Sequence, residues 1–169
     1  MGRLVPLKNV PWLIENLETL GCNLLLQALD TPLLTVAELE RQVEERGLRD
    51  RVRFLPPGRD VGTLLRSIDA LVVASQHEGF PMVVVEAGLL GVPVISTRVG
   101  ALPELFADEI LFFDSADATS LRGALAQAGP VWGERLRAKV TRLCDRDAVV
   151  SQYLDVVERV HFDRQRHAA

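Results

Sequence analysis

The chain has 169 residues, which suits a single domain that can bury a full hydrophobic core without disulfides or metals. Hydrophobic residues make up 48% of the chain and charged residues 25%, as in an ordinary globular domain. The formal net charge of −4 argues against nucleic acid as a partner, and no apolar run reaches the roughly 20 residues that span a bilayer.

The predicted elements alternate between helices with an apolar stripe and short apolar strands. The clearest helix start is Thr35, because Glu38 three residues later completes a capping box. In chain order we expect a helix over 9–20, a strand over 23–28, a helix over 35–46, a strand over 51–55, a helix over 61–67, a strand over 70–74, a helix over 81–90, a strand over 93–96, a helical turn over 102–106, a strand over 109–113, a helix over 118–127 and two further helices between 131 and 159.

This order is typical of the α/β class and predicts a Rossmann-like parallel sheet with helices on both faces. The domain is expected over 1–162, with the C-terminal helices over 130–162 and a frayed polar tail over 163–169. Sheets of this kind bind ligands at the carboxyl ends of their strands. The candidate binding loops are therefore those that follow Ala28, Leu55, Ala74 and Ser96.

The two cysteines, Cys22 and Cys144, are far apart in the sequence and lack metal-ligand spacing. We expect two reduced thiols, which favours a cytoplasmic protein. The N-terminal residues Met1 to Arg3 do not open a secretory signal, because no apolar stretch follows them.

The loop after the strand over 70–74 carries the most informative chemistry. It reads Ser75-Gln76-His77-Glu78-Gly79-Phe80-Pro81 and leads into a helix. We expect Pro81 at the first helical position, where the free N–H groups of the first turn form an anion site suited to a diphosphate. Glu78 lies in the loop and Glu86 lies inside the apolar helix. Glu86 either accepts hydrogen bonds from sugar hydroxyls or simply emerges on the solvent side of the helix.

Two other segments are candidates for ligand contact. Gly100, after the strand over 93–96, either brings the backbone close to a ligand or forms an ordinary tight turn. Arg3 and Lys8 are two cations that precede the first helix. They could hold a diphosphate, although two cations in a loop are most often solvated surface.

Taken together, these motifs resemble the signature of family 4 retaining glycosyltransferases, which have the GT-B architecture of two Rossmann-like domains. The resemblance runs from about Gly2 to Leu125, and its motifs fall in the family's order. The matching segments are Gly2-Arg3 with Lys8-Asn9, Arg51 to Leu55, Ser67 to Ser75, Glu78 to Pro81, Glu86-Ala87, Gly91 to Ile95, Gly100 and Pro103-Glu104.

The resemblance implies a nucleoside-diphosphate sugar as substrate, with no cofactor and no metal. It implies that Arg3 and Lys8 neutralise the diphosphate, that Glu78 binds hydroxyls of the donor sugar and that Glu86 binds the ribose. Glu78, Arg3 and Lys8 are therefore the expected catalytic set. The remaining donor-binding positions implied are Gly2, Gly79, Phe80, Pro81, Phe54 and Leu55.

The sequence also departs from the family pattern. The loop from Ala28 to Pro32 lacks the family's glycines, the strand before the basic loop is missing or cut short, and the acceptor domain is absent. We therefore expect a fragment of a longer enzyme or one chain of a split transferase, inactive by itself. A position at the inner face of the membrane would arise only through the absent domain. The final helices should expose an apolar face; its candidates are Leu136, Val140, Leu143, Val149, Val150, Tyr153, Leu154 and Val157.

Other classes of function were also weighed against the sequence. A non-catalytic subunit could keep the fold and act through a partner chain. A nucleotide-sugar epimerase or a phosphorylase is disfavoured by the glutamate spacing, and a dehydrogenase by the lack of Gly-x-Gly-x-x-Gly after a strand.

Overall fold

The computed structural model describes residues 2–166, and its strands form two parallel half-sheets. The first has the order β1–β2–β3 and the second the order β4–β5–β6. All four strand pairings are parallel, as the alternation of strands and helices predicts. The strands are β1 (Gly2–Arg3), β2 (Leu24–Leu29), β3 (Val52–Leu55), β4 (Leu71–Val73), β5 (Val94–Ser96) and β6 (Leu111–Phe112).

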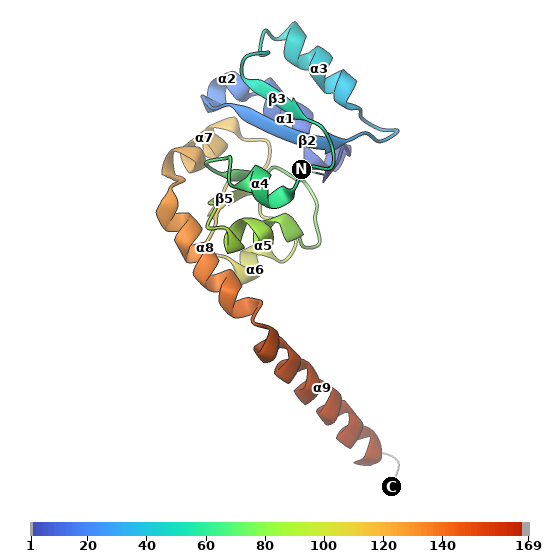
Figure 1. Cartoon of the computed structure of the whole chain (residues 1–169). Helices are drawn as coiled ribbons and strands as arrows, with labels where there is room; N and C mark the ends of the chain where they lie inside the picture. Colours follow the sequence, from blue (N-terminus) through green and yellow to red (C-terminus); the bar gives the residue numbers. More distant parts are fainter. Residues whose placement is uncertain (1, 167–169) are drawn as a thin grey trace.

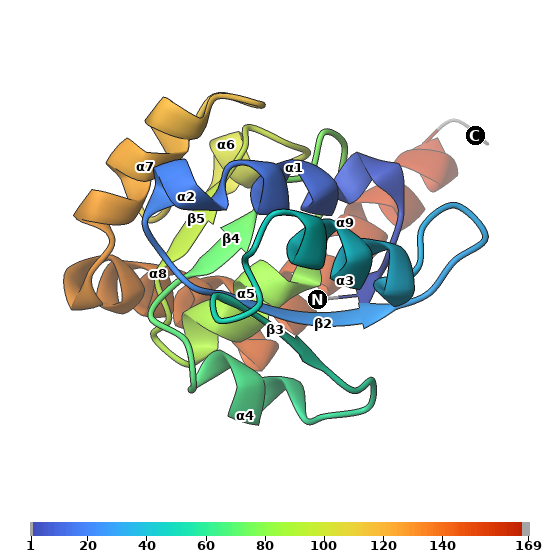
Figure 2. The ribbon, with the colours of Figure 1, turned by 90° about the horizontal axis from the view of Figure 1, so that it is seen from above.

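Helices cover both faces of these half-sheets (Figures 1 and 2). The predicted helices are all present, with ends that differ by a few residues from the expected ones. The helices are α1 (Val10–Glu15), α2 (Leu17–Leu20), α3 (Val36–Glu45), α4 (Val61–Leu65), α5 (Met82–Leu89), α6 (Leu102–Leu105), α7 (Ala118–Gln127), α8 (Pro130–Leu143) and α9 (Arg146–Arg166). A 3₁₀ helix, η1 (Pro6–Lys8), lies where a loop was predicted from the sequence.

Three apolar clusters hold the layers together. One joins α1, α2 and α3 to the first half-sheet, with Ile14 and Leu39 almost fully buried. The second packs α5, α6 and α8 against the second half-sheet. The third lies between α1, α2 and α7 on the opposite face, and Ile95 of β5 is buried in it. Helices on both faces and a parallel pattern confirm the predicted fold class.

Local chemistry explains where the helices start and stop. The predicted capping box is present: the Thr35 hydroxyl accepts from the Glu38 N–H at 3.3 Å, and the Glu38 carboxylate accepts from the Thr35 N–H at 2.8 Å. The helix expected over 9–20 is instead divided at Asn16, whose side chain donates to the Trp12 carbonyl. A side chain that bonds to the backbone in this way competes with the helical ladder.

Three further expectations need correction. Pro81 is the N-cap of α5 with extended backbone, and the helix starts at Met82. The helix α9 continues through Arg166, so residues 163–166 of the expected tail are helical, while 167–169 lie outside the described residues. Leu136 and Val140 are fully buried, because α8 lies directly on α5. Only the α9 candidates and Leu143 are exposed as expected.

Candidate functional site

The candidate site lies at the carboxyl end of β4, where the loop from Ser75 to Pro81 meets η1. The Gln76 N–H donates to the Leu7 carbonyl at 2.7 Å, which ties this loop to the basic segment near the N-terminus. Lys8 follows Leu7 and is the last residue of η1. This one backbone bond therefore places a cation from the start of the chain beside the glutamate loop.

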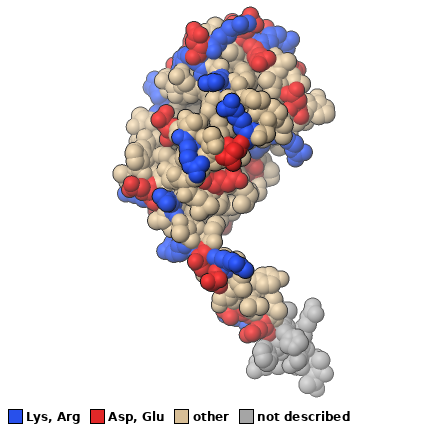
Figure 3. Space-filling model, viewed as in Figure 1, with Lys and Arg blue, Asp and Glu red and all other residues tan. Residues whose placement is uncertain are grey.

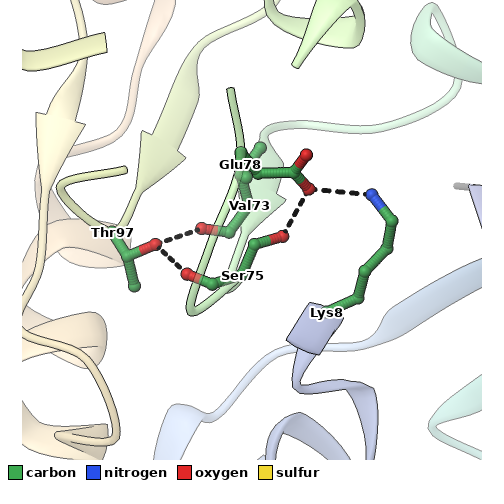
Figure 4. Close-up of polar contacts among 5 residues, drawn as sticks. All are labelled: Lys8, Val73, Ser75, Glu78 and Thr97. Carbon is green, nitrogen blue, oxygen red and sulfur yellow. Dashed lines mark hydrogen bonds and ion pairs between the residues drawn. The ribbon is translucent and has the colours of Figure 1, made fainter. Parts of the chain in front are cut away.

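Glu78 is the centre of the polar contacts (Figure 4). Its Oε1 accepts from Lys8 Nζ at 2.9 Å and from Ser75 Oγ at 2.8 Å. Burial raises the pKa of Glu78, but the hydrogen bonds from Lys8 and Ser75 and the nearby positive charges outweigh burial and hold the pKa below its usual value. Glu78 is therefore ionised at neutral pH. Its second carboxylate oxygen, Oε2, is left to accept bonds from a ligand.

Two buried residues hold this glutamate loop in place. Thr97, after β5, donates its hydroxyl to the Ser75 carbonyl at 2.5 Å, and the same hydroxyl lies 3.4 Å from the Val73 carbonyl. Thr97 and Ser75 are 2% and 3% exposed. Neither residue was predicted from the sequence to have a role. The available signal was their position, since each is a hydroxyl residue directly after an apolar strand.

Gly100 packs against the same loop. Its φ is +53°, and a Cβ built on it would lie 1.9 Å from the Gly79 carbonyl oxygen. The neighbouring Ala101 N–H donates to that oxygen at 3.1 Å. The close approach foreseen for Gly100 is thus an approach to the backbone of Glu78 and Gly79.

The other predicted residues lie around this centre. Gly2 and Arg3 are exposed in β1, and Glu86 is exposed on α5. Within residues 2–166, no hydrogen bond or ion pair joins Arg3 or Glu86 to Glu78. The ring of Phe80 stacks on Phe106 with centroids 6.3 Å apart, and Phe54 and Leu55 end β3.

The structure thus brings Lys8 and Glu78 into direct contact and leaves Arg3 and Glu86 without a link to them. In this arrangement an ammonium group lies beside an ionised carboxylate. The ammonium group can contact a phosphate, and the carboxylate can accept hydrogen bonds from sugar hydroxyls. Lys8, Ser75 and Glu78 line one end of a cavity of about 1180 Å³ that continues between β2 and β4.

Among residues 2–159, no three His, Cys, Asp or Glu side chains are grouped so that they could hold a metal ion. None of the helices described there is long and apolar enough to cross a membrane. On the face drawn in Figure 3, acidic and basic side chains are intermixed.

Comparison with known proteins gives a family match and similar structures. Residues 1–129 match the family model "Glycosyl transferases group 1". A D-inositol 3-phosphate glycosyltransferase from Saccharomonospora viridis is 36% identical over 108 residues, which cover 62% of this chain and 24% of that protein. The chain thus spans about a quarter of the length of this relative.

Two solved structures share the fold. HepE of Anabaena in complex with UDP and glucose has a TM-score of 0.77 at 23% identity, covering 94% of this chain and 47% of that one. The C-terminal domain of LpcC, a glycosyl transferase group 1 family protein from Francisella tularensis, has a TM-score of 0.71 at 24% identity, covering 84% and 82%.

Proposed function

Because the chain belongs to the glycosyl transferases group 1 family and has the fold of a GT-B C-terminal domain, we propose that it binds the nucleoside-diphosphate sugar of a retaining family 4 glycosyltransferase. In this proposal the sugar is transferred to a hydroxyl acceptor with retention of configuration. A second domain supplies the acceptor site, so the isolated chain binds the donor without turning it over. We place this activity in the cytoplasm.

The observation that carries the proposal is the contact between Lys8 and Glu78, residues that are 70 positions apart. The pair is half-shielded from water, with the side chains 34% and 19% exposed. Lys8 and Arg3 face the diphosphate, where a fixed positive charge stabilises the leaving group as its negative charge grows. Glu78 accepts hydrogen bonds from the hydroxyls of the donor sugar.

The remaining assignments rest on the family to which the chain belongs. Glu86 on α5 contacts the ribose hydroxyls. Gly2, Gly79, Phe80 and Pro81 line the sugar and phosphate region, and Phe54 and Leu55 lie beside the base, after β3. The charge on the diphosphate is met by side chains and by N–H groups at the start of α5, so no metal and no cofactor enter the proposal.

The test is a thermal-shift panel of uridine, guanosine and adenosine diphosphates with the purified chain. A nucleotide at a hundredfold excess over its dissociation constant stabilises the native state by about 2.7 kcal/mol, or roughly 5–10 °C in Tm. Absence of a shift with every nucleotide would overturn the proposal.

Two variants then separate the roles of the pair. Lys8→Met should lower the affinity for the nucleoside diphosphate at least about tenfold, which corresponds to about 1.4 kcal/mol of binding free energy. Glu78→Gln should instead abolish the preference for the nucleotide sugar over the free nucleotide. The matched control is Lys139→Met, because Lys139 on α8 lies 3.7 Å from Glu109 in a separate ion pair. If Lys139→Met lowers the affinity for the nucleotide as much as Lys8→Met does, the assignment of Lys8 is wrong.

A second candidate function is that of a subunit acting through a partner chain. The exposed apolar side chains of α9 favour it, since Val150, Tyr153 and Leu154 are 49%, 70% and 53% exposed. The helix projects away from the body of the molecule (Figure 1). Exposed apolar surface of this kind marks interaction sites. A stable complex with a second chain in the absence of any nucleotide binding would favour this role.

A further inference from the structure

Ser75 and Lys8 both donate to Oε1 of Glu78, but the two donors are held very differently. The Lys8 side chain is 34% exposed at the end of η1, and its ammonium group sits on a flexible four-carbon stem. Ser75 is 3% exposed, and its short side chain places the hydroxyl close to the backbone. Lys8 can therefore turn towards a phosphate, whereas the Ser75 hydroxyl stays where the backbone puts it.

The backbone around Ser75 is fixed from two sides. Thr97, which follows β5, donates its hydroxyl to the Ser75 carbonyl and its N–H to the Val73 carbonyl, the latter at 3.0 Å. On the other side, the Gln76 N–H donates to the Leu7 carbonyl at 2.7 Å. Figure 4 shows this arrangement, in which Thr97 holds the backbone of Ser75 while the Ser75 hydroxyl reaches Glu78. The position of the Ser75 hydroxyl is therefore set by the sheet.

The orientation of the Glu78 carboxylate depends on its donors. The terminal torsion of a glutamate side chain is broad, so the rotamer alone does not fix the plane of the carboxylate. Each carboxylate oxygen accepts about two hydrogen bonds, and Oε1 already has two, from Lys8 at 2.9 Å and from Ser75 at 2.8 Å. Across residues 2–159, no hydrogen bond is made to Oε2, which is turned away from both donors (Figure 4).

A bound diphosphate would change this balance. In the proposed function Lys8 meets the diphosphate, so its ammonium group is shared with the phosphate oxygens or leaves Glu78 altogether. Ser75 is then the donor that still fixes the carboxylate. A ligand contact depends on a group being held within about 10–20° of its productive orientation by the residues around it.

We propose that Ser75 is a positioning residue, whose hydroxyl keeps the Glu78 carboxylate turned towards the hydroxyls of the donor sugar when Lys8 engages the diphosphate. Thr97 supports this role by fixing the backbone of Ser75. The inference rests on the proposed function and deepens it. It assigns the selectivity for a nucleotide sugar over the free nucleotide in part to a residue that does not itself touch the ligand.

The first test measures affinities by calorimetry for Ser75→Ala, with UDP and UDP-glucose, GDP and GDP-mannose, and ADP and ADP-glucose. The variant should bind the free diphosphate within about twofold of the unmodified chain. Its affinity for the matching nucleotide sugar should fall at least about fivefold, because an oriented hydrogen bond to a charged group is weakened. Ser75→Cys should behave alike, since a thiol has similar bulk but is a weak donor.

The matched control is Ser96→Ala. Ser96 is fully buried at the end of the neighbouring strand β5, and its hydroxyl donates to the Thr97 carbonyl at 2.8 Å. This variant removes an equally buried hydroxyl that does not contact Glu78. Both affinities should therefore stay within about twofold of those of the unmodified chain.

The second test needs no ligand. The pKa of Glu78 is followed by carbon-detected NMR titration of the carboxyl group in the unmodified chain and in the two alanine variants. Ser75→Ala should raise the pKa of Glu78, because the hydrogen bond from Ser75 favours the ionised form. Ser96→Ala should leave the pKa of Glu78 as it is in the unmodified chain.

The outcomes separate this inference from the proposed function. If the unmodified chain binds none of the nucleotides, or binds each sugar conjugate no better than the free diphosphate, the sugar contact of Glu78 is wrong and the role of Ser75 falls with it. If the unmodified chain prefers a nucleotide sugar and Ser75→Ala keeps that preference, only the role of Ser75 is overturned. The same conclusion follows if Ser96→Ala loses the preference equally, or if the pKa of Glu78 is unchanged in Ser75→Ala.

Discussion

Gly100→Ala tests whether the close approach of two loops shapes the candidate site. At φ +53° an alanine carries a left-handed backbone, which costs about 1–2 kcal/mol, offset in part by the lower entropy of its unfolded chain. The new Cβ would also lie 1.9 Å from the Gly79 carbonyl oxygen and 2.6 Å from that of Glu78. Both atoms belong to the backbone, so the loop itself must move. Overpacking of this kind adds about 1–3 kcal/mol.

The total expected loss for Gly100→Ala is about 2–4 kcal/mol, measured by urea unfolding at unchanged m-value. Gly47→Ala is the matched control, because Gly47 has a φ of +67° but nothing within 4 Å of its Cβ position. It should lose only about 1 kcal/mol. Gly123→Ala, in the open interior of α7, should gain up to about 1 kcal/mol. Equal losses in Gly100→Ala and Gly47→Ala would refute the clash with the glutamate loop.

Two further predictions concern charge and packing. Because the folded pKa of Glu78 is lowered, its ionised form stabilises the protein above about pH 4.5, and this contribution is lost as pH falls through the folded pKa. The difference in free energy of unfolding between the protein and Glu78→Gln, about 1 kcal/mol at pH 7 after allowance for solvent screening, should therefore close as the pH falls below 4.5 and through the folded pKa. A constant difference from pH 7 to about pH 3 would contradict it. Leu136→Ala should lower the free energy of chemical unfolding by about 2–5 kcal/mol, because Leu136 is fully buried. Leu154→Ala, on the exposed face of α9, should change it by no more than about 0.5 kcal/mol. Similar losses in the two variants would disprove the packing of α8 on α5.

Local sequence patterns were sufficient to predict those features of the fold that depend on residues a few positions apart. The capping box at Thr35 depends on residues three positions apart, and the structure contains it. The alternation of apolar strands and helices predicted the parallel pairing of all the described strands, because parallel strands need a crossover between them. Asn16 shows the limit of such patterns, since an apolar stripe continues through the residue at which the helix divides.

The site was predicted in its components but not in its contacts. The motif pointed to Lys8 and Glu78 separately, as a basic loop and a glutamate loop. Their 2.9 Å contact depends on η1 lying against the end of β4 through the Gln76–Leu7 bond. Thr97 and Ser75 were missed because a hydroxyl after a strand acquires its role only when the neighbouring strand supplies a partner.

The sequence by itself determined the fold class, the order of the elements and the loops in which ligand chemistry is concentrated, because periodicity and turn residues act over a few positions. Only the tertiary structure decided which carboxylate meets which cation and that Gly100 lies against the backbone of the glutamate loop. These features join residues far apart in the chain. Their energies come from burial and from pairing across elements, which no short window of sequence contains.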